Sequence, residues 1–323
     1  MTTRTEDKDA AGCGCRPPDP PHPVHRQSAL PGDRPKPDHE DPGAPERVRV
    51  LIESPAYQEA DSDFAFLNSP LARGPRLQLD YLKAETLLQA EGLTDAIVVF
   101  GSTRLAEPSA ARARLAAARD ASANAPDDPR LRERVGVAER LLEKSKYYDV
   151  AREFGALVGA ACDCPDCRRL VVVTGGGPGA MEAANRGAFD VGAPTVGFNI
   201  ALPREQFPNP YLTPGLCFRF HYFAIRKLHL LQRARALVAF PGGYGTFDEL
   251  FETLTLAQTR KIRPLPIVLV GESFWRQAFN VDFLVAEGVI DPEDRDLFWY
   301  AESAHDIWES ILGWWEKAGA PLI

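Results

Sequence analysis

A glycine-rich stretch in the second half of the chain carries the residues best suited to chemistry. It follows an apolar run that ends at Phe240 and consists of Pro241-Gly242-Gly243-Tyr244-Gly245-Thr246-Phe247-Asp248-Glu249. Glycine lets a backbone approach an anion closely, and the first N–H groups of a following helix point at the bound charge. The pattern therefore predicts a phosphate-binding turn, whose expected contacts are Gly242, Gly243, Tyr244, Gly245 and Thr246.

Glu249 follows Thr246 by three residues, and two interpretations of that spacing remain open. Thr-x-x-Glu is the pattern of a capping box, with Thr246 at the helix N-cap and Glu249 bonded back to the backbone. Alternatively, the Glu249 carboxylate lies beside the group to which the phosphate is attached and takes part in the reaction. Asp248 is the alternate acid, although the default role of an acid in a first helical turn is to offset the helix dipole.

Arg226 and Lys227 are adjacent in a segment with helical spacing upstream of this turn. Neighbouring helix residues diverge by about 100°, so these two cannot both face one small site squarely. A single arginine on a helix is most often a solvated or salt-bridged group whose stem covers apolar neighbours. The residues alone leave a surface role open for one of the two.

The Pro-Gly-Gly-Tyr-Gly-Thr-x-x-Glu motif, with Phe223-Ala224-Ile225-Arg226-Lys227 on the preceding helix, resembles the LOG (Lonely Guy) family of nucleoside 5′-monophosphate phosphoribohydrolases. That family was long labelled as lysine decarboxylases, and the resemblance covers roughly Ala96 to Trp315. It implies that Arg226 is the catalytic arginine with Lys227 beside it, and that the protein is at least a dimer. Phe-Ala-Ile precedes Arg226 here where plant members have Met-His-x, a departure that bears on substrate preference.

The resemblance also points to Glu205, in Leu202-Pro203-Arg204-Glu205-Gln206, as a further acid that contacts the substrate. The alternative for Glu205 is an exposed charge on a loop.

These groups suit cleavage of an N-glycosidic bond. Breaking that bond develops oxocarbenium character at the ribose C1′, so a nearby carboxylate can stabilise positive charge and orient or deprotonate water. Glu249 is our candidate for this role, while Arg226 would hold substrate oxygens and help the base depart. We expect hydrolysis of AMP or an N6-modified AMP to free base and ribose 5-phosphate, without cofactor or metal.

Three other functions compete with this hypothesis. A noncatalytic nucleotide or cofactor carrier needs only the glycine turn, and the combination of Arg226 with Glu249 favours the hydrolase over it. A pyridoxal-phosphate decarboxylase needs a Schiff-base lysine and an acid for the pyridine nitrogen, and Lys227 lies on the wrong kind of element for that. The polar, glycine-rich strand ends argue against a purely structural oligomerisation module.

Apolar strands and helical segments alternate along the chain, which requires parallel pairing with right-handed crossovers. We therefore expect an α/β fold, a doubly wound, Rossmann-like, mostly parallel sheet with helices on both faces. The expected strands are 96–100, 170–174, 195–198, 218–220, 237–240, 267–270 and 297–300. The expected helices are 130–160 with an interruption near 147–148, 180–191, 221–234, 247–260, 275–287 and 304–317.

Three glycine-bearing strand ends should meet where such sheets bind ligands. They are Gly101-Ser102, Gly175-Gly176-Gly177-Pro178-Gly179-Ala180 and the turn after Phe240. The middle one also matches an NAD fingerprint, which calls for an acid at the end of the next strand, but that strand ends in Asn199. We favour tight packing beside a mononucleotide, with Gly101, Ser102, Gly175, Gly176 and Gly177 among the substrate contacts.

The beginning of the chain differs in composition from the rest. Ten of the 28 prolines lie in residues 1–45, among polar and charged residues that cannot bury enough apolar surface to offset their ordering entropy. We expect a disordered tail over 1–45 and an extension over 46–95 docked on the core, with a strand at Val48–Ile52 and a helix at Leu77–Ala90. Residues 96–323 form the expected catalytic domain.

Charge and hydropathy restrict the partners. A net charge of −8 and a pI near 5.4 supply no field that attracts nucleic acid or anionic membrane. No apolar run approaches the length of a membrane span, and polar residues rather than a signal core follow Met1. We expect a cytoplasmic homodimer or higher homo-oligomer that binds a small nucleotide.

The six cysteines are too few for a disulfide scaffold of this size. Cys162, Cys164 and Cys167, together with Cys13 and Cys15, could supply zinc ligands, but their spacing is not a standard pair of knuckles. A turn that carries reduced thiols is the favoured interpretation.

Overall fold

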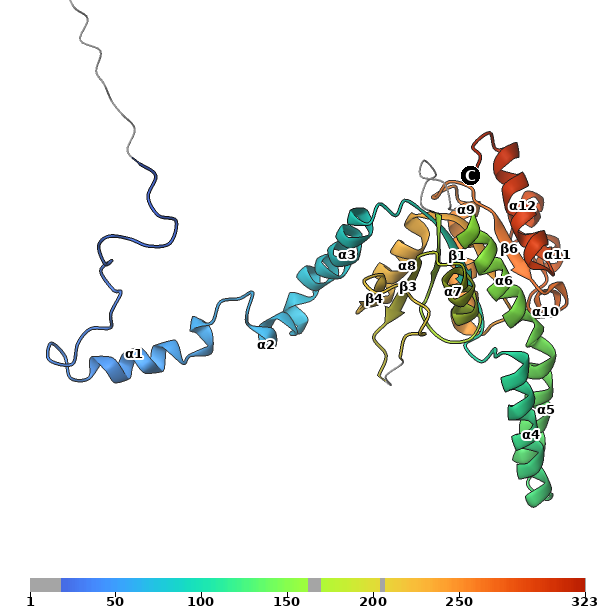
Figure 1. The fold of residues 1–323 in the computed structure, drawn as a ribbon, viewed down its shortest axis with the longest axis horizontal. Coiled ribbons are helices and arrows are strands. Elements are labelled where there is room, and N and C mark those ends of the chain that lie inside the picture. The colour runs from blue at the N-terminus through green and yellow to red at the C-terminus, as the bar shows by residue number, and fades with distance from the viewer. Residues whose placement is uncertain (1–18, 162–169, 204–206, 323) are drawn as a thin grey trace, which may run out of the picture. The chain divides into compact units, whose positions relative to one another are not determined.

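The computed structural model describes residues 19–161, 170–203 and 207–322, and all that follows concerns those residues (Figure 1). They divide into two compact units, Met1–Leu71 and Ala72–Ile323. This division falls inside the extension expected over 46–95. The expected tail and domain limits remain predictions.

The first unit contains the short helices α1 (Ala44–Ile52), η1 (Pro55–Tyr57) and α2 (Phe64–Leu67). The strand expected at Val48–Ile52 is wrong, because this segment belongs to α1. Arg49 pairs with Glu46 at 2.6 Å and with Glu53 at 2.7 Å, spacings that only a helix brings together. The segment has no partner strand within the described part of this unit, and Val50 is 55% exposed.

The second unit is built on a seven-stranded sheet in which every pair of neighbouring strands is parallel. Its order is β4-β3-β2-β1-β5-β6-β7. The strands are β1 (Asp95–Phe100), β2 (Leu170–Thr174), β3 (Thr195–Ile200), β4 (Cys217–Phe220), β5 (Ala234–Ala239), β6 (Ile267–Val270) and β7 (Trp299–Ala301). The expected doubly wound α/β fold is confirmed.

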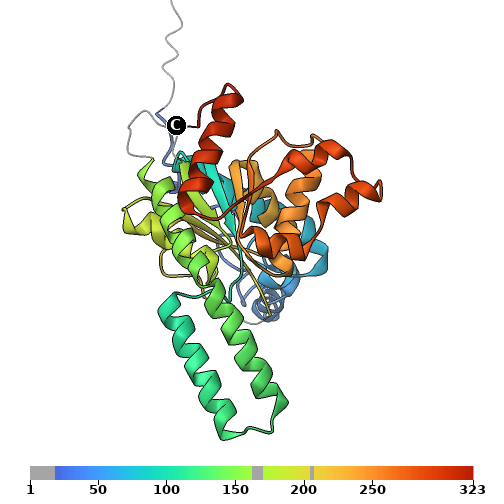
Figure 2. The same cartoon turned by 90° about the vertical axis from the view of Figure 1, so that its right-hand side faces the viewer.

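Helices cover both faces of this sheet (Figures 1 and 2). The helices that pack on the sheet are α3 (Arg73–Ala90), α6 (Lys146–Ala160), α7 (Ala180–Asp190), α8 (Phe223–Gln232), α9 (Tyr244–Gln258), α10 (Glu272–Ala278), α11 (Val281–Ala286) and α12 (Ala304–Lys317), whereas α4 (Pro108–Asn124) and α5 (Pro129–Lys144) form a hairpin that projects from it. Short turns η2 (Pro70–Ala72) and η3 (Pro292–Leu297) complete the described elements.

Successive residues of a strand belong to two separate hydrophobic cores, one on each face of the sheet, as a pleated sheet buried on both faces requires. Ile97 and Val99 of β1 pack with α6, α7 and α12, whereas Val98 and Phe100 pack with α3, α8, α9 and α10. Burying both faces explains why each central strand appears in the sequence as a continuous apolar run rather than an alternating one.

Most expected elements lie where the pattern placed them, and the differences are local. The helix expected over 275–287 is two helices, α10 and α11, because Asn280 caps a new helix by accepting a hydrogen bond from the N–H of Phe283. The strand expected over 297–300 begins only at Trp299, after η3. The break expected near 147–148 falls at Ser145.

The order in which strands are added to the sheet reverses between β1 and β5, and this reversal determines where the glycine turns lie. From β1 the chain winds outward through β2, β3 and β4, and it then returns to add β5 on the other side of β1. The N–H of Phe240 donates to the carbonyl of Phe100 at 2.9 Å, and that of Ser102 donates to the carbonyl of Pro241 at 3.0 Å. Two of the predicted phosphate-binding turns therefore lie side by side at the switch point.

Candidate active site

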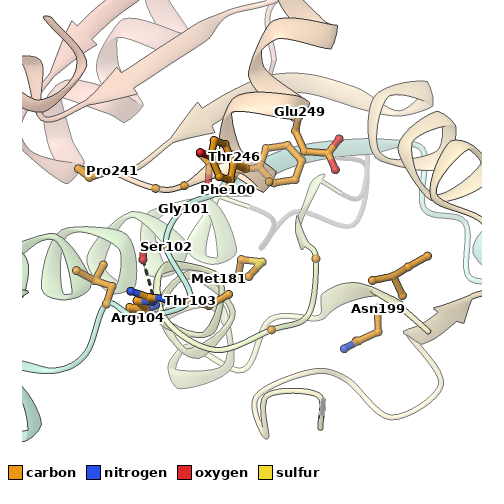
Figure 3. Close-up of a pocket in the computed structure, with 18 of the residues that line it drawn as sticks. Phe100, Gly101, Ser102, Thr103, Arg104, Met181, Asn199, Pro241, Thr246 and Glu249 are labelled. Atoms are coloured by element: carbon orange, nitrogen blue, oxygen red, sulfur yellow. Dashed lines mark hydrogen bonds between the residues drawn. The ribbon is translucent and has the colours of Figure 1, made fainter. Parts of the chain in front are cut away.

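A cleft of about 700 Å³ opens at the carboxyl ends of β1 and β5 (Figure 3). All three glycine turns contribute to it, as do the beginnings of α8, α9 and α10. Its lining comprises Phe100, Gly101, Ser102, Thr103, Arg104, Leu105, Leu141, Lys144, Gly175, Gly177, Met181, Asn199, Ile200, Leu202, Phe223, Arg226, Pro241, Gly242, Gly243, Tyr244, Gly245, Thr246, Glu249 and Phe274. A ligand cleft at this place is what a doubly wound sheet favours.

Helix α9 begins earlier than its sequence pattern predicted. Its N-cap is Gly243, which makes no side-chain cap, so Thr246 lies inside the first turn and Glu249 in the second. The capping box of Thr246 and Glu249 is therefore absent, and that interpretation is wrong. A side chain at Gly242 would meet Thr246 Oγ1 at 2.1 Å, which explains why the chain needs glycine where the turn folds over the helix start.

The early start of α9 leaves unpaired donors at the cleft. Among the described residues, the backbone N–H groups of Gly243, Tyr244 and Gly245 make no hydrogen bond to the protein, whereas the N–H of Thr246 donates to the carbonyl of Gly243. These unpaired groups lie at the positive end of the helix dipole. The turn has the donors that a phosphate needs.

Glu249 is buried and paired with Arg226. The Arg226 Nη2 donates to Glu249 Oε1 at 2.8 Å, and only 5% of the Glu249 side chain is exposed. Burial raises the pKa of Glu249, while the charge and hydrogen bond of Arg226 act against that rise. The Arg226 Nε is buried and has no hydrogen-bond partner, so this cleft residue has one N–H donor that is available to a ligand.

Lys227 and Asp248 lie outside this cleft. Lys227 Nζ is 2.8 Å from a carboxylate oxygen of Asp248 and 3.1 Å from one of Glu252, and these residues line a neighbouring groove. Burial would lower the pKa of Lys227, but its hydrogen bonds to the two carboxylates raise it overall. The divergence of Arg226 and Lys227 expected for adjacent helix residues is confirmed.

The turn after β2 packs tightly against the turn after β1. Gly179 has φ +81° and precedes α7, and a side chain there would meet the Ser102 carbonyl at 2.1 Å. Gly175 and Gly177 line the cleft, whereas Gly176 packs against Asn199 and is not part of the lining. This tight packing agrees with the expectation that the turn packs beside a mononucleotide rather than forming a dinucleotide fingerprint.

Several lining residues were not among the sequence candidates. Arg104, Met181, Asn199, Phe223 and Lys144 come from five different segments. Figure 3 shows Arg104 and Asn199 on opposite sides of the view, with Glu249 above them. Arg104 follows Gly101 by three residues, a proximity that could have drawn notice, but no local signal marks Lys144 at the end of α5.

Two groups of expected residues cannot be placed. Glu205 lies outside the described residues, as do Cys162, Cys164 and Cys167. Cys217 is described; it is a free cysteine on an exposed residue, and partial desolvation of its sulfur raises the pKa of the thiol. Its Sγ donates to Asn199 Oδ1 at 3.4 Å.

No helix in the described part of the chain is both long and apolar enough to cross a membrane.

Comparisons with known proteins agree with the motif. A family model described as "Possible lysine decarboxylase" matches residues 181–311. The cytokinin riboside 5′-monophosphate phosphoribohydrolase LOG1 of Arabidopsis thaliana is 30% identical over 169 residues, which are 51% of this chain and 74% of LOG1. The cytokinin riboside 5′-monophosphate phosphoribohydrolase LOG of Oryza sativa subsp. japonica is also 30% identical, over 51% of this chain and 65% of the LOG chain.

Among solved structures, the X-ray structure of TM1055 covers 67% of this chain and 98% of its own, at 20% identity and a TM-score of 0.41. The matched model, the identity to LOG1 and the share of LOG1 that is covered together place this chain in the LOG family.

Proposed function

We propose that this protein hydrolyses the N-glycosidic bond of a nucleoside 5′-monophosphate, AMP or an N6-modified AMP, to free base and ribose 5-phosphate. The observation that carries the proposal is the Arg226–Glu249 pair, buried in the same cleft as the unpaired N–H groups at the start of α9. The turn at the start of α9 supplies donors for a phosphate, and the pair supplies a carboxylate and a cation for the reacting centre.

Glu249 would act on the sugar. Its carboxylate stabilises the positive charge that develops at C1′ and orients or deprotonates the attacking water. Burial makes that charge effective, since few water molecules screen it. Arg226 opposes the rise in the pKa of Glu249 that burial causes, and its free Nε can donate to a substrate oxygen or to the departing base.

Backbone N–H groups at the start of α9 would bind the phosphate. The N–H groups of Gly243, Tyr244 and Gly245 hold the 5′-phosphate, and this remote binding energy orients C1′ against Glu249. The apolar side chains Ile200, Leu202 and Phe223 in the lining suit a flat base, and Asn199 offers an amide for its edge.

A panel of substrates tests the proposal. Purified protein is incubated with AMP, N6-isopentenyl-AMP, IMP, CMP and the matching nucleosides, and ribose 5-phosphate or ribose is measured. We expect the 5′-monophosphates to have far higher kcat/KM values than the nucleosides, with one or both adenine nucleotides at the top. Equal kcat/KM for AMP and adenosine would contradict it, and tight binding of AMP without turnover would favour the noncatalytic carrier.

A further inference from the structure

The hairpin formed by α4 and α5 brings a cation into the cleft from far along the chain. This hairpin projects from the sheet layers, and its base lies at the strand-end edge (Figure 2). Lys144, the last residue of α5, lines the cleft together with Leu141. The hairpin precedes the residues 181–311 that the family model matches.

Lys144 and Arg104 are the cleft cations that the proposed reaction leaves unused. Arg226 is neutralised by Glu249, but in the described part of the chain neither Arg104 nor Lys144 has an ion pair. Lys144 is half-buried and Arg104 is exposed, so both cations remain accessible to an anion that enters the cleft. A protein of net charge −8 thus keeps two unpaired cations in the cleft that contains its glycine turns.

The base of the hairpin is anchored, so Lys144 does not sit on a loose arm. Glu107, just before α4, forms an ion pair with Arg186 of α7. Just after α5, the Tyr148 hydroxyl donates to Glu182 of α7 at 2.8 Å, and Tyr148 is 2% exposed. Both ends of the hairpin are therefore held by α7, whose first turn lines the cleft through Met181.

We infer that Lys144 and Arg104 form a cationic subsite for the 5′-phosphate of the substrate, which makes the α4–α5 hairpin a specificity element of the cleft. This inference rests on the proposed function for the identity of the phosphate. The backbone N–H groups of α9 contribute only partial charges, whereas a phosphate monoester carries nearly two negative charges at pH 7. Lysine and arginine complete the neutralisation and select against uncharged nucleosides.

Binding of ribose 5-phosphate tests the subsite independently of catalysis. Titration calorimetry compares wild type with Lys144→Met and Arg104→Met, which remove the charge and keep an apolar stem. The matched control is Arg140→Met, which removes a cation one turn earlier on α5, exposed and outside the lining. We expect Kd for ribose 5-phosphate to rise about tenfold in each test variant and to change less than about twofold in the control.

The kinetic result should follow the same pattern. Lys144→Met should raise KM for AMP about tenfold with kcat nearly unchanged, Lys144→Arg should restore most of the affinity, and kcat/KM for adenosine should not move. Unchanged binding of ribose 5-phosphate in both test variants would overturn the subsite. So would a loss of affinity for ribose and adenosine as large as the loss for their 5′-phosphates. A wild type that binds ribose 5-phosphate through Lys144 yet hydrolyses no nucleotide would overturn only the proposed function.

Discussion

Helix α8 and the residue that ends it hold two buried arginine–glutamate pairs, and the two pairs are built differently. At its carboxyl end, Arg233 donates to both oxygens of Glu85 on α3, at 2.8 and 2.9 Å, and its Nε donates to the carbonyl of Leu93 at 3.0 Å. Two turns earlier, Arg226 makes one hydrogen bond to Glu249 and its Nε has none.

This difference in hydrogen bonding indicates that the Arg233–Glu85 pair is structural and that the Arg226–Glu249 pair is not. Every guanidinium nitrogen of Arg233 is satisfied, and its hydrogen bonds hold the pKa of Glu85 below the usual range. Burial instead raises the pKa of Glu249, against the pull of Arg226. A fully bonded pair joins α3 to the sheet, whereas an incompletely bonded pair in a cleft is arranged for a ligand.

The largest expected effect is on turnover. Glu249→Gln keeps the shape of the side chain and removes its charge, so kcat for the preferred 5′-monophosphate should fall about 10²-fold or more, while ribose 5-phosphate binding stays near wild type. Release of ribose 5-phosphate measures it. The control is Glu252→Gln, on the same helix but outside the cleft. Near-wild-type kcat for Glu249→Gln would leave Asp248 or Glu205 as the acid to test.

The second effect is on stability. Arg233→Met leaves Glu85 buried without its partner, so the free energy of unfolding should fall by about 3 kcal/mol, with kcat of the folded protein within about twofold of wild type. Urea unfolding and kcat measured below the transition separate the two quantities. If turnover fell with stability unchanged, Arg233 would belong to the reaction and the contrast between the pairs would fail.

The two carboxyl groups should respond to pH with opposite signs. Glu85 has a lowered folded-state pKa, so its contribution to stability is present above the unfolded value of 4.5 and is lost as pH falls through the folded value. Glu249 has a raised pKa, so its contribution is present below 4.5 and is lost as pH rises through the folded value. Carboxyl NMR titration, assigned with Glu85→Gln and Glu249→Gln, measures both. A Glu249 midpoint at or below 4.5 would remove the contrast.

The smallest effect concerns the pair that points away from the cleft. Lys227→Met and Asp248→Asn should each leave kcat within about threefold of wild type, because both side chains line the neighbouring groove. Asp248 is 55% exposed and Lys227 is 16% exposed, so solvent screens the carboxylate side of this ion pair and weakens its contribution to stability. A loss of turnover in Lys227→Met as large as that in Glu249→Gln would mean that the cleft extends to this groove during the reaction.

Local patterns in the sequence were sufficient for the central strands, since β2 and β6 have the predicted limits and α12 does as well. A run of apolar residues bounded by glycine or polar residues specifies a strand buried on both faces, whatever the rest of the chain does. Local reasoning failed at Val48–Ile52, because a short apolar segment forms a strand only where a neighbouring strand exists to pair with it.

The candidate catalytic residues and the glycine turns could likewise be predicted from the sequence, because backbone freedom and helix dipoles act over a few residues. Tertiary structure alone decided what those residues contact. Thr246 and Glu249 had the spacing of a cap, and only the earlier start of α9 turned Glu249 toward Arg226, which lies 23 residues away in the chain. Lys144 and Arg104 share a cleft because α7 anchors the hairpin at both ends, a long-range packing that no local pattern records.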